Sequence, residues 1–82
     1  MNIQLIQGQF SAKDALNIIT QMVHVKIKYH EEKIQHSSNE EDIKMREAKI
    51  KRLQKDLFEV KNYVDQVGNI LLQSEINLTS LS

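Results

Sequence analysis

The chain has 82 residues, with eleven basic side chains against eleven acidic ones, three histidines and no cysteine. Chains below about 80 residues bury only a thin core and are usually reinforced by disulfides, a metal ion or oligomerisation. The absence of cysteine excludes disulfides and does not favour a structural zinc site, so a homodimer or higher homo-oligomer is expected. The balanced charge provides no global field to attract nucleic acid.

The first residues, Met1 to Gln7, carry no basic side chain and only a short apolar stretch. This pattern fits neither a signal peptide nor a transit peptide. No run approaches the roughly 18 apolar residues that a membrane span needs. We therefore expect a cytoplasmic protein without a membrane partner, built as one helical-hairpin domain over residues 1–82.

The first predicted helix covers residues 12–36. Ser11 precedes it as a candidate N-cap, with Asp14 three residues later as a weak form of the capping-box acid. Its apolar residues cover an arc of roughly 200°, about twice the width that one neighbouring helix covers. This width indicates that a second chain packs on the helix. The candidate self-interface takes residues from both predicted helices: Ile18, Met22, Val25, Tyr29, Phe58 and Tyr63.

The second predicted helix covers residues 39–67, with Ser38 as its N-cap and Gly68 as a left-handed C-terminal stop. A heptad pattern runs along it, which is typical of a coiled coil. Charged pairs four residues apart, Asp42–Arg46 among them, are expected to support its exposed faces. The heptad positions are Ile43, Arg46, Ile50, Leu53, Leu57, Val60, Val64 and Val67, of which Arg46 alone is not apolar.

Residues 70–79 alternate between apolar and polar side chains, which predicts a β-strand, and residues 2–7 form a weaker candidate. Both chain ends lie at the same end of a helical hairpin, so the strands can pair antiparallel. The predicted fold is mainly α: an antiparallel two-helix, coiled-coil-like hairpin in the order β-α-α-β, forming a four-helix assembly as a homodimer. Residues 70–79 could instead continue the second helix, and a plain helical hairpin with frayed ends is the alternative fold.

His30 lies in the middle of the apolar face of the first helix. Folding the chain about residues 37–38 sets His30 opposite the turn that carries Met45, Arg46 and Glu47. His30, Arg46 and Glu47 therefore form a candidate polar layer at the one fault in the heptad. Three interpretations stay open: a loosely packed, hydrated end of the hairpin, a hydrogen-bonded layer that fixes the helix register, or a functional site.

The residues that could support chemistry are few. His24, His30 and His36 are six residues apart, so they point about 120° from one another on a helix and cannot bind one ion together. There is no cysteine nucleophile and no glycine-rich phosphate loop, so we expect neither an enzyme nor a cofactor or metal site.

The sequence favours a protein–protein interaction or structural module that acts through homodimerisation, together with a protein partner that the sequence does not identify. The alternative is a small nucleic-acid-binding or antitoxin-like regulator that uses the basic stretch 44–55. That stretch has no interleaved aromatic for base stacking, and its cations are scattered around the helix, so a nucleic-acid partner is not favoured.

Overall fold

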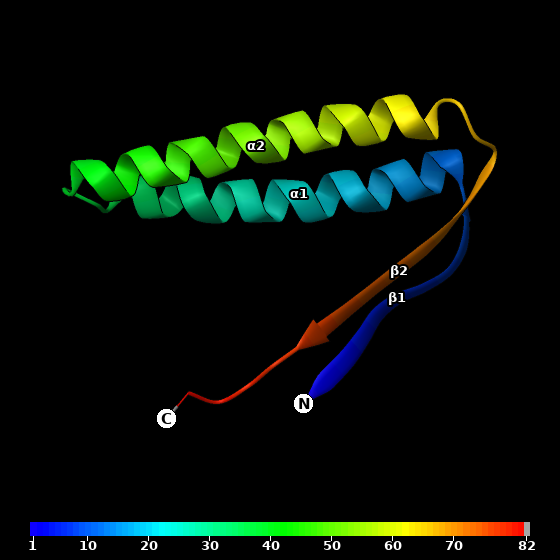
Figure 1. The fold of residues 1–82 in the computed structure, drawn as a ribbon, viewed down its shortest axis with the longest axis horizontal. Coiled ribbons are helices and arrows are strands. Elements are labelled where there is room, and N and C mark those ends of the chain that lie inside the picture. The colour runs from blue at the N-terminus through cyan, green and yellow to red at the C-terminus, as the bar shows by residue number, and fades with distance from the viewer. Residues whose placement is uncertain (82) are drawn as a thin grey trace.

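The computed structural model describes residues 1–81, which form two helices and two strands (Figure 1). Strand β1 spans Asn2–Ser11, helix α1 spans Ala12–Gln35, helix α2 spans Glu40–Val64 and strand β2 spans Asn69–Asn77. The predicted β-α-α-β order, the mainly helical content and the antiparallel pairing of the terminal strands are confirmed.

The starts of the two helices are held by side-chain caps. Ser11 Oγ accepts from the backbone N–H of Asp14 at 3.1 Å, as predicted. The cap of α2 was assigned wrongly to Ser38, because Asn39 Oδ1 accepts from the Asp42 N–H at 3.1 Å. The hydroxyl that supports the turn is that of Ser37, which accepts from the Asn39 N–H at 3.2 Å.

Helix α2 ends three residues earlier than predicted. Its last residue is Val64, and a tight turn follows in which the Val67 N–H donates to the Val64 carbonyl at 3.2 Å. Gly68 does not have the left-handed backbone expected of a C-terminal stop, since Gly8 is the one residue among 1–81 with a positive φ. The Gly68 carbonyl instead accepts from the Ala12 N–H at 2.9 Å and joins the end of α2 to the start of α1.

The β-ribbon is longer at its helical end than the predicted ranges 2–7 and 70–79. Strand β1 continues through Gly8 to Ser11, and β2 begins at Asn69 and ends at Asn77. Its register shifts between Gln4 and Ile6, so Leu5 is an extra residue in a β-bulge. Because of the bulge, one face carries nearly all the apolar side chains: Ile3, Ile6, Phe10, Ile70, Leu72 and Ile76.

The contact between α1 and α2 is a single seam. Every predicted heptad position of α2 is buried or half-buried, which confirms the pattern. The fully enclosed part is small, since the buried hydrophobic residues are Ala15 at 0% and Val64 at 2% exposure. Among residues 1–81 no large side chain is completely buried. Most apolar side chains on the seam therefore keep one side exposed.

The two layers meet only at one end. The hairpin and the ribbon diverge from the junction, so the molecule has the outline of a V (Figure 1) with extents of 45 × 33 × 13 Å. The main contacts of the ribbon with the helices are made with α1. We call the space between α1 and the ribbon the wedge.

The cap assignment can be tested with two adjacent alanine variants. Asn39→Ala should lower the free energy of unfolding by about 1 kcal/mol, because the Asp42 N–H loses its acceptor. Ser38→Ala should change it by less than about 0.5 kcal/mol. Urea denaturation followed by circular dichroism measures both, and a larger loss for Ser38→Ala would contradict the assignment.

The two glycines should respond differently to alanine. Gly8 has a φ of 155°, which side-chain-bearing residues rarely adopt, so Gly8→Ala should destabilise the fold by about 1 kcal/mol or more. A Cβ at Gly68 would meet no heavy atom within 4 Å, so Gly68→Ala should be neutral or slightly stabilising. Thermal unfolding compares the two, and equal losses would refute the difference.

Candidate functional site

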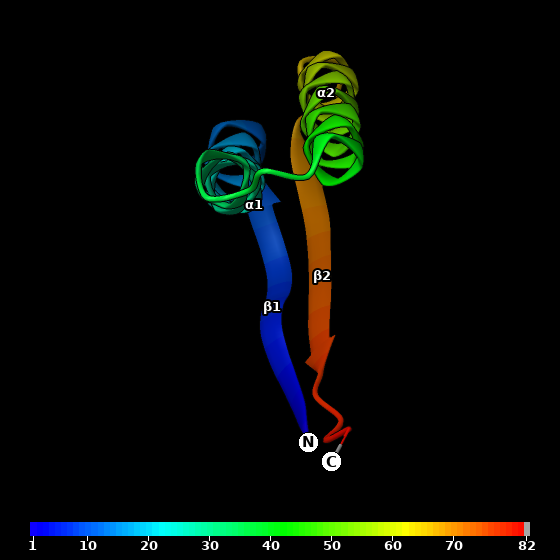
Figure 2. The ribbon, with the colours of Figure 1, turned by 90° about the vertical axis from the view of Figure 1, so that its left-hand side faces the viewer.

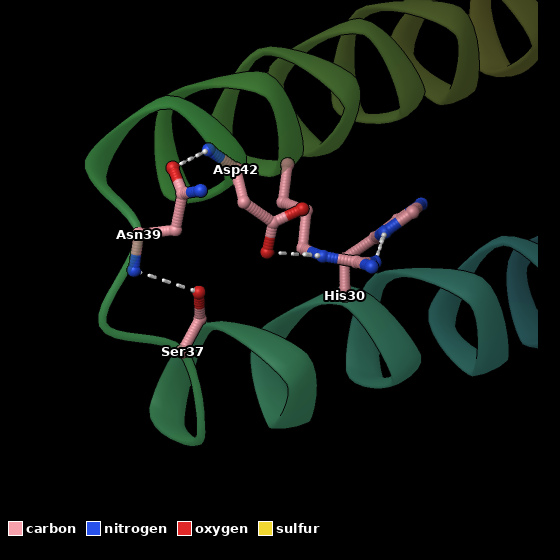
Figure 3. A network of polar contacts seen from close by, with 5 residues as sticks. His30, Ser37, Asn39 and Asp42 are labelled. Atoms are coloured by element: carbon pink, nitrogen blue, oxygen red, sulfur yellow. Dashed lines mark hydrogen bonds and ion pairs between the residues drawn. The ribbon is translucent and has the colours of Figure 1, made fainter.

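A chain of polar contacts crosses the seam near the helical turn (Figure 3). Asp42 Oδ2 accepts from Arg46 Nε at 3.2 Å, and Arg46 Nη1 donates to His30 Nδ1 at 3.1 Å. The backbone N–H of Asp42 is also bound by the cap residue Asn39. The polar layer therefore connects the start of α2 to the middle of the apolar face of α1.

Tyr29 covers the outer side of this layer. The guanidinium carbon of Arg46 lies 5.8 Å from the centre of the Tyr29 ring, and Lys33 Nζ lies 5.7 Å from it. The rings of Tyr29 and His30 meet edge to face, with 5.5 Å between their centres. Arg46 is thus held by a carboxylate, an imidazole and an aromatic face, which accounts for a charged residue at a heptad position.

The surroundings of His30 favour its neutral form. Its side chain is 4% exposed, and burial, followed by the charges of Arg46, Lys49 and Lys26, lowers its pKa below the usual 6.5. Arginine can only donate hydrogen bonds, so Nδ1 must be the acceptor and the ring proton lies on Nε2. Nε2 is buried and has no hydrogen-bond partner among residues 1–81.

The predicted polar layer and the observed one differ in one member. His30 and Arg46 are brought together, whereas Glu47 is exposed and the carboxylate in the layer belongs to Asp42. The expectation that Asp42–Arg46 is an exposed surface pair was wrong, because these side chains are only 31% and 19% exposed. Their spacing of four residues predicted that Asp42 and Arg46 pair with each other. It did not predict that the pair faces α1, because that depends on how the two helices pack near the turn that joins them.

Four of the predicted self-interface residues, Ile18, Met22, Val25 and Tyr29, form a stripe along α1. Helical geometry places this stripe about 130° around α1 from the seam. In Figure 2 the ribbon lies below α1, and its main contacts with the helices are made with α1. Ile18, the stripe residue nearest the junction, is half-buried, whereas Met22, Val25 and Tyr29 are 40%, 71% and 51% exposed, so the stripe is more exposed beyond its first residue.

The remaining two candidates, Phe58 and Tyr63 on α2, are 65% and 64% exposed. Five residues separate them, so they point about 140° apart and do not form one surface. The structure therefore separates the predicted self-interface into one continuous apolar stripe on α1 and two isolated aromatic side chains.

The ribbon supplies the second wall of the wedge. Its apolar face is less exposed at the junction end, where Phe10 and Ile70 are half-buried, than at the far end, where Ile3 and Ile76 are 39% and 41% exposed. The α1 stripe and the ribbon are therefore both less exposed beside the junction than away from it, which is consistent with contact between α1 and the ribbon at that end. This arrangement was not predicted from the sequence, because the angle between the two layers has no local signal.

The basic stretch 44–55 lies along the outer and lower sides of α2. Apart from Arg46, its cations are exposed. Lys49 and Arg52 face the groove between the helices, while Lys51 and Lys55 are on the outer surface. The stretch therefore does not form a single basic surface.

No group of three or more histidine, aspartate or glutamate side chains within residues 1–81 is arranged to hold a metal ion. Neither helix in the described part of the chain is long and apolar enough to cross a membrane. Comparison with protein families, with curated proteins and with solved structures finds no match to this chain.

Burial of neutral His30 predicts a dependence of stability on pH. Below pH 6.5 the histidine in the unfolded chain takes up a proton, whereas His30 in the folded protein resists it because its pKa is lowered. The free energy of unfolding should therefore fall as the pH decreases through 6.5 and down to the folded pKa, by at most about 1.4 kcal/mol per pH unit. Urea denaturation at pH values from 7.5 to 5 measures this slope.

Matched variants assign the slope to one residue. His30→Gln should remove most of the pH dependence of stability. His24→Gln, at an exposed position of α1, and His36→Gln, at its exposed C-cap, should retain that dependence. Retention of the full slope in His30→Gln would show that another group is responsible.

Proposed function

We propose that this chain is a homodimeric protein–protein interaction module whose wedge is filled by a second copy. The supporting observation is its surface area. A folded monomer of 9.6 kDa exposes about 5,100 Å², whereas this chain exposes 6787 Å². The excess of roughly 1,700 Å² is at least as large as the area that one partner usually buries in a stable complex.

The chemistry of the wedge supports the same proposal. One wall is the α1 stripe and the other is the apolar face of the ribbon, and both are more exposed away from the junction than beside it. Burying this surface is favourable by about 25 cal/mol per Å². A lone two-stranded ribbon is marginally stable in water, so contact with a second copy would also stabilise β1 and β2.

A second copy suits the wedge because the chain has no net charge, so two copies do not repel each other strongly. Pairing two hairpins gives the expected four-helix assembly. The polar layer of His30, Arg46 and Asp42 then has the role of fixing the register of α1 against α2, since a shift would leave their buried polar atoms unpaired. The partner served by this dimer is another protein.

Sedimentation equilibrium at micromolar concentration tests the proposal. A dimer should persist, with little change in affinity, when the salt concentration is raised, because apolar burial rather than charge drives the association. A stable, folded monomer at these concentrations would refute it, and a dimer that dissociates in salt would indicate a charged interface instead.

Two adjacent substitutions localise the interface. Val25→Glu places a charge in the α1 stripe and should weaken the dimer by at least about tenfold, since the carboxylate would be buried without a partner. His24→Glu introduces the same side chain one residue away, outside the stripe, and should leave the affinity nearly unchanged. Because Val25 is 71% exposed within one chain, the variant should keep its helical circular dichroism signal.

A further inference from the structure

A groove lies between α1 and α2 and adjoins the polar layer, with which it shares His30. It has a volume of about 310 Å³ and is lined by Lys26, His30, Lys49, Arg52, Leu53 and Asp56. This volume is at the lower end of the range for small-molecule sites. The groove is distinct from the apolar surface that supports dimerisation, because its lining is mostly charged.

His30 lines this groove and has an unused hydrogen-bond donor. Arg46 occupies Nδ1, so the proton of the neutral ring is on Nε2, which is buried and unpaired among residues 1–81. Figure 3 shows the second ring nitrogen of His30 pointing away from Arg46. A buried donor without an acceptor costs about 1–3 kcal/mol, so an acceptor at this place would be strongly favoured.

The charges around Nε2 determine which acceptor fits. Lys26, Lys49 and Arg52 line the groove, and none of them forms an ion pair within residues 1–81. With the single carboxylate of Asp56, the lining carries a net charge of about +2, since lysine and arginine are protonated at neutral pH. Lys26 and Lys49 also act on His30 through their charge, which places both of them near the ring.

We propose that this groove binds a phosphate group, either as inorganic phosphate or as part of a small phosphorylated molecule. His30 Nε2–H donates to one oxygen, and Lys26, Lys49 and Arg52 neutralise the charge. A phosphate carries about −1.5 to −2 at neutral pH and offers three strong acceptor oxygens, which matches both the charge and the donors of the lining. Arginine supplies the planar donor pair that phosphate oxygens accept.

The ligand reaches His30 through movement of long side chains. Lys26, Lys49 and Arg52 are exposed, and side chains of this kind change rotamer within nanoseconds. The backbone of α1 and α2 need not move. Arg46, itself bound by Asp42, holds the His30 ring through Nδ1, so the ring can keep its orientation while these side chains move.

The experiment is a titration of the assembled protein with inorganic phosphate at low salt, observed through the imidazole nitrogens of His30 by NMR. A saturable shift of the Nε2 signal, with Nδ1 remaining an acceptor, is the expected result. A parallel titration with glycerol phosphate distinguishes the two sources of the group, and tighter binding of either compound supports the proposal. Absence of a saturable shift with both compounds would overturn it.

Two charge-removing variants test the groove, and a third outside it is the control. Lys49→Gln and Arg52→Gln should each weaken phosphate binding by at least about fivefold, because each removes a cation from the groove. Lys51→Gln removes the same charge from the outer side of α2 and should weaken binding by less than about twofold. The proposal would be overturned if Lys51→Gln weakened phosphate binding as much as Lys49→Gln and Arg52→Gln do. Binding of duplex DNA without binding of inorganic phosphate would also overturn it.

Discussion

The structure depends on a single line of contact between two helices. A helix packed against one neighbour buries one stripe of side chains, and within residues 1–81 the enclosed apolar residues are Ala15 and Val64. The ribbon adds contact only where it leaves the junction. Much of the wide apolar surface of α1 therefore stays exposed. The V shape arises because the helical hairpin and the β-ribbon are in contact at one end only.

The polar layer limits how the seam can be arranged. An arginine at a heptad position would normally disrupt a hydrophobic contact, but Arg46 is bound by Asp42, His30 and the face of Tyr29. These contacts exist in one register of the hairpin. They also hold the ring of His30, which lines the cationic groove. The proposed phosphate site would therefore depend on the same imidazole ring as the helix register.

Two surfaces of the molecule thus have different chemistry. The wedge is apolar and suits a second copy, whereas the groove between the helices is cationic and suits a phosphate group. They are neighbours on α1, where Val25 of the stripe directly precedes Lys26 of the groove. A bound phosphate and a bound second copy would therefore be close enough for each to affect the affinity of the other.

Local patterns were sufficient to predict the order of the elements. The heptad of α2, the Ser11 cap and the alternation after Gly68 are short-range signals, since each depends on residues within a few turns or strand positions. The ends of α2 were predicted less well, because Ser37, Ser38 and Asn39 can all cap and only the folded turn selects Asn39. The replacement of Glu47 by Asp42 in the polar layer, the angle of the ribbon and the groove at His30 Nε2 depend on contacts between elements far apart in the chain. Such contacts are decided by packing in three dimensions, for which a linear pattern of side chains contains no direct signal.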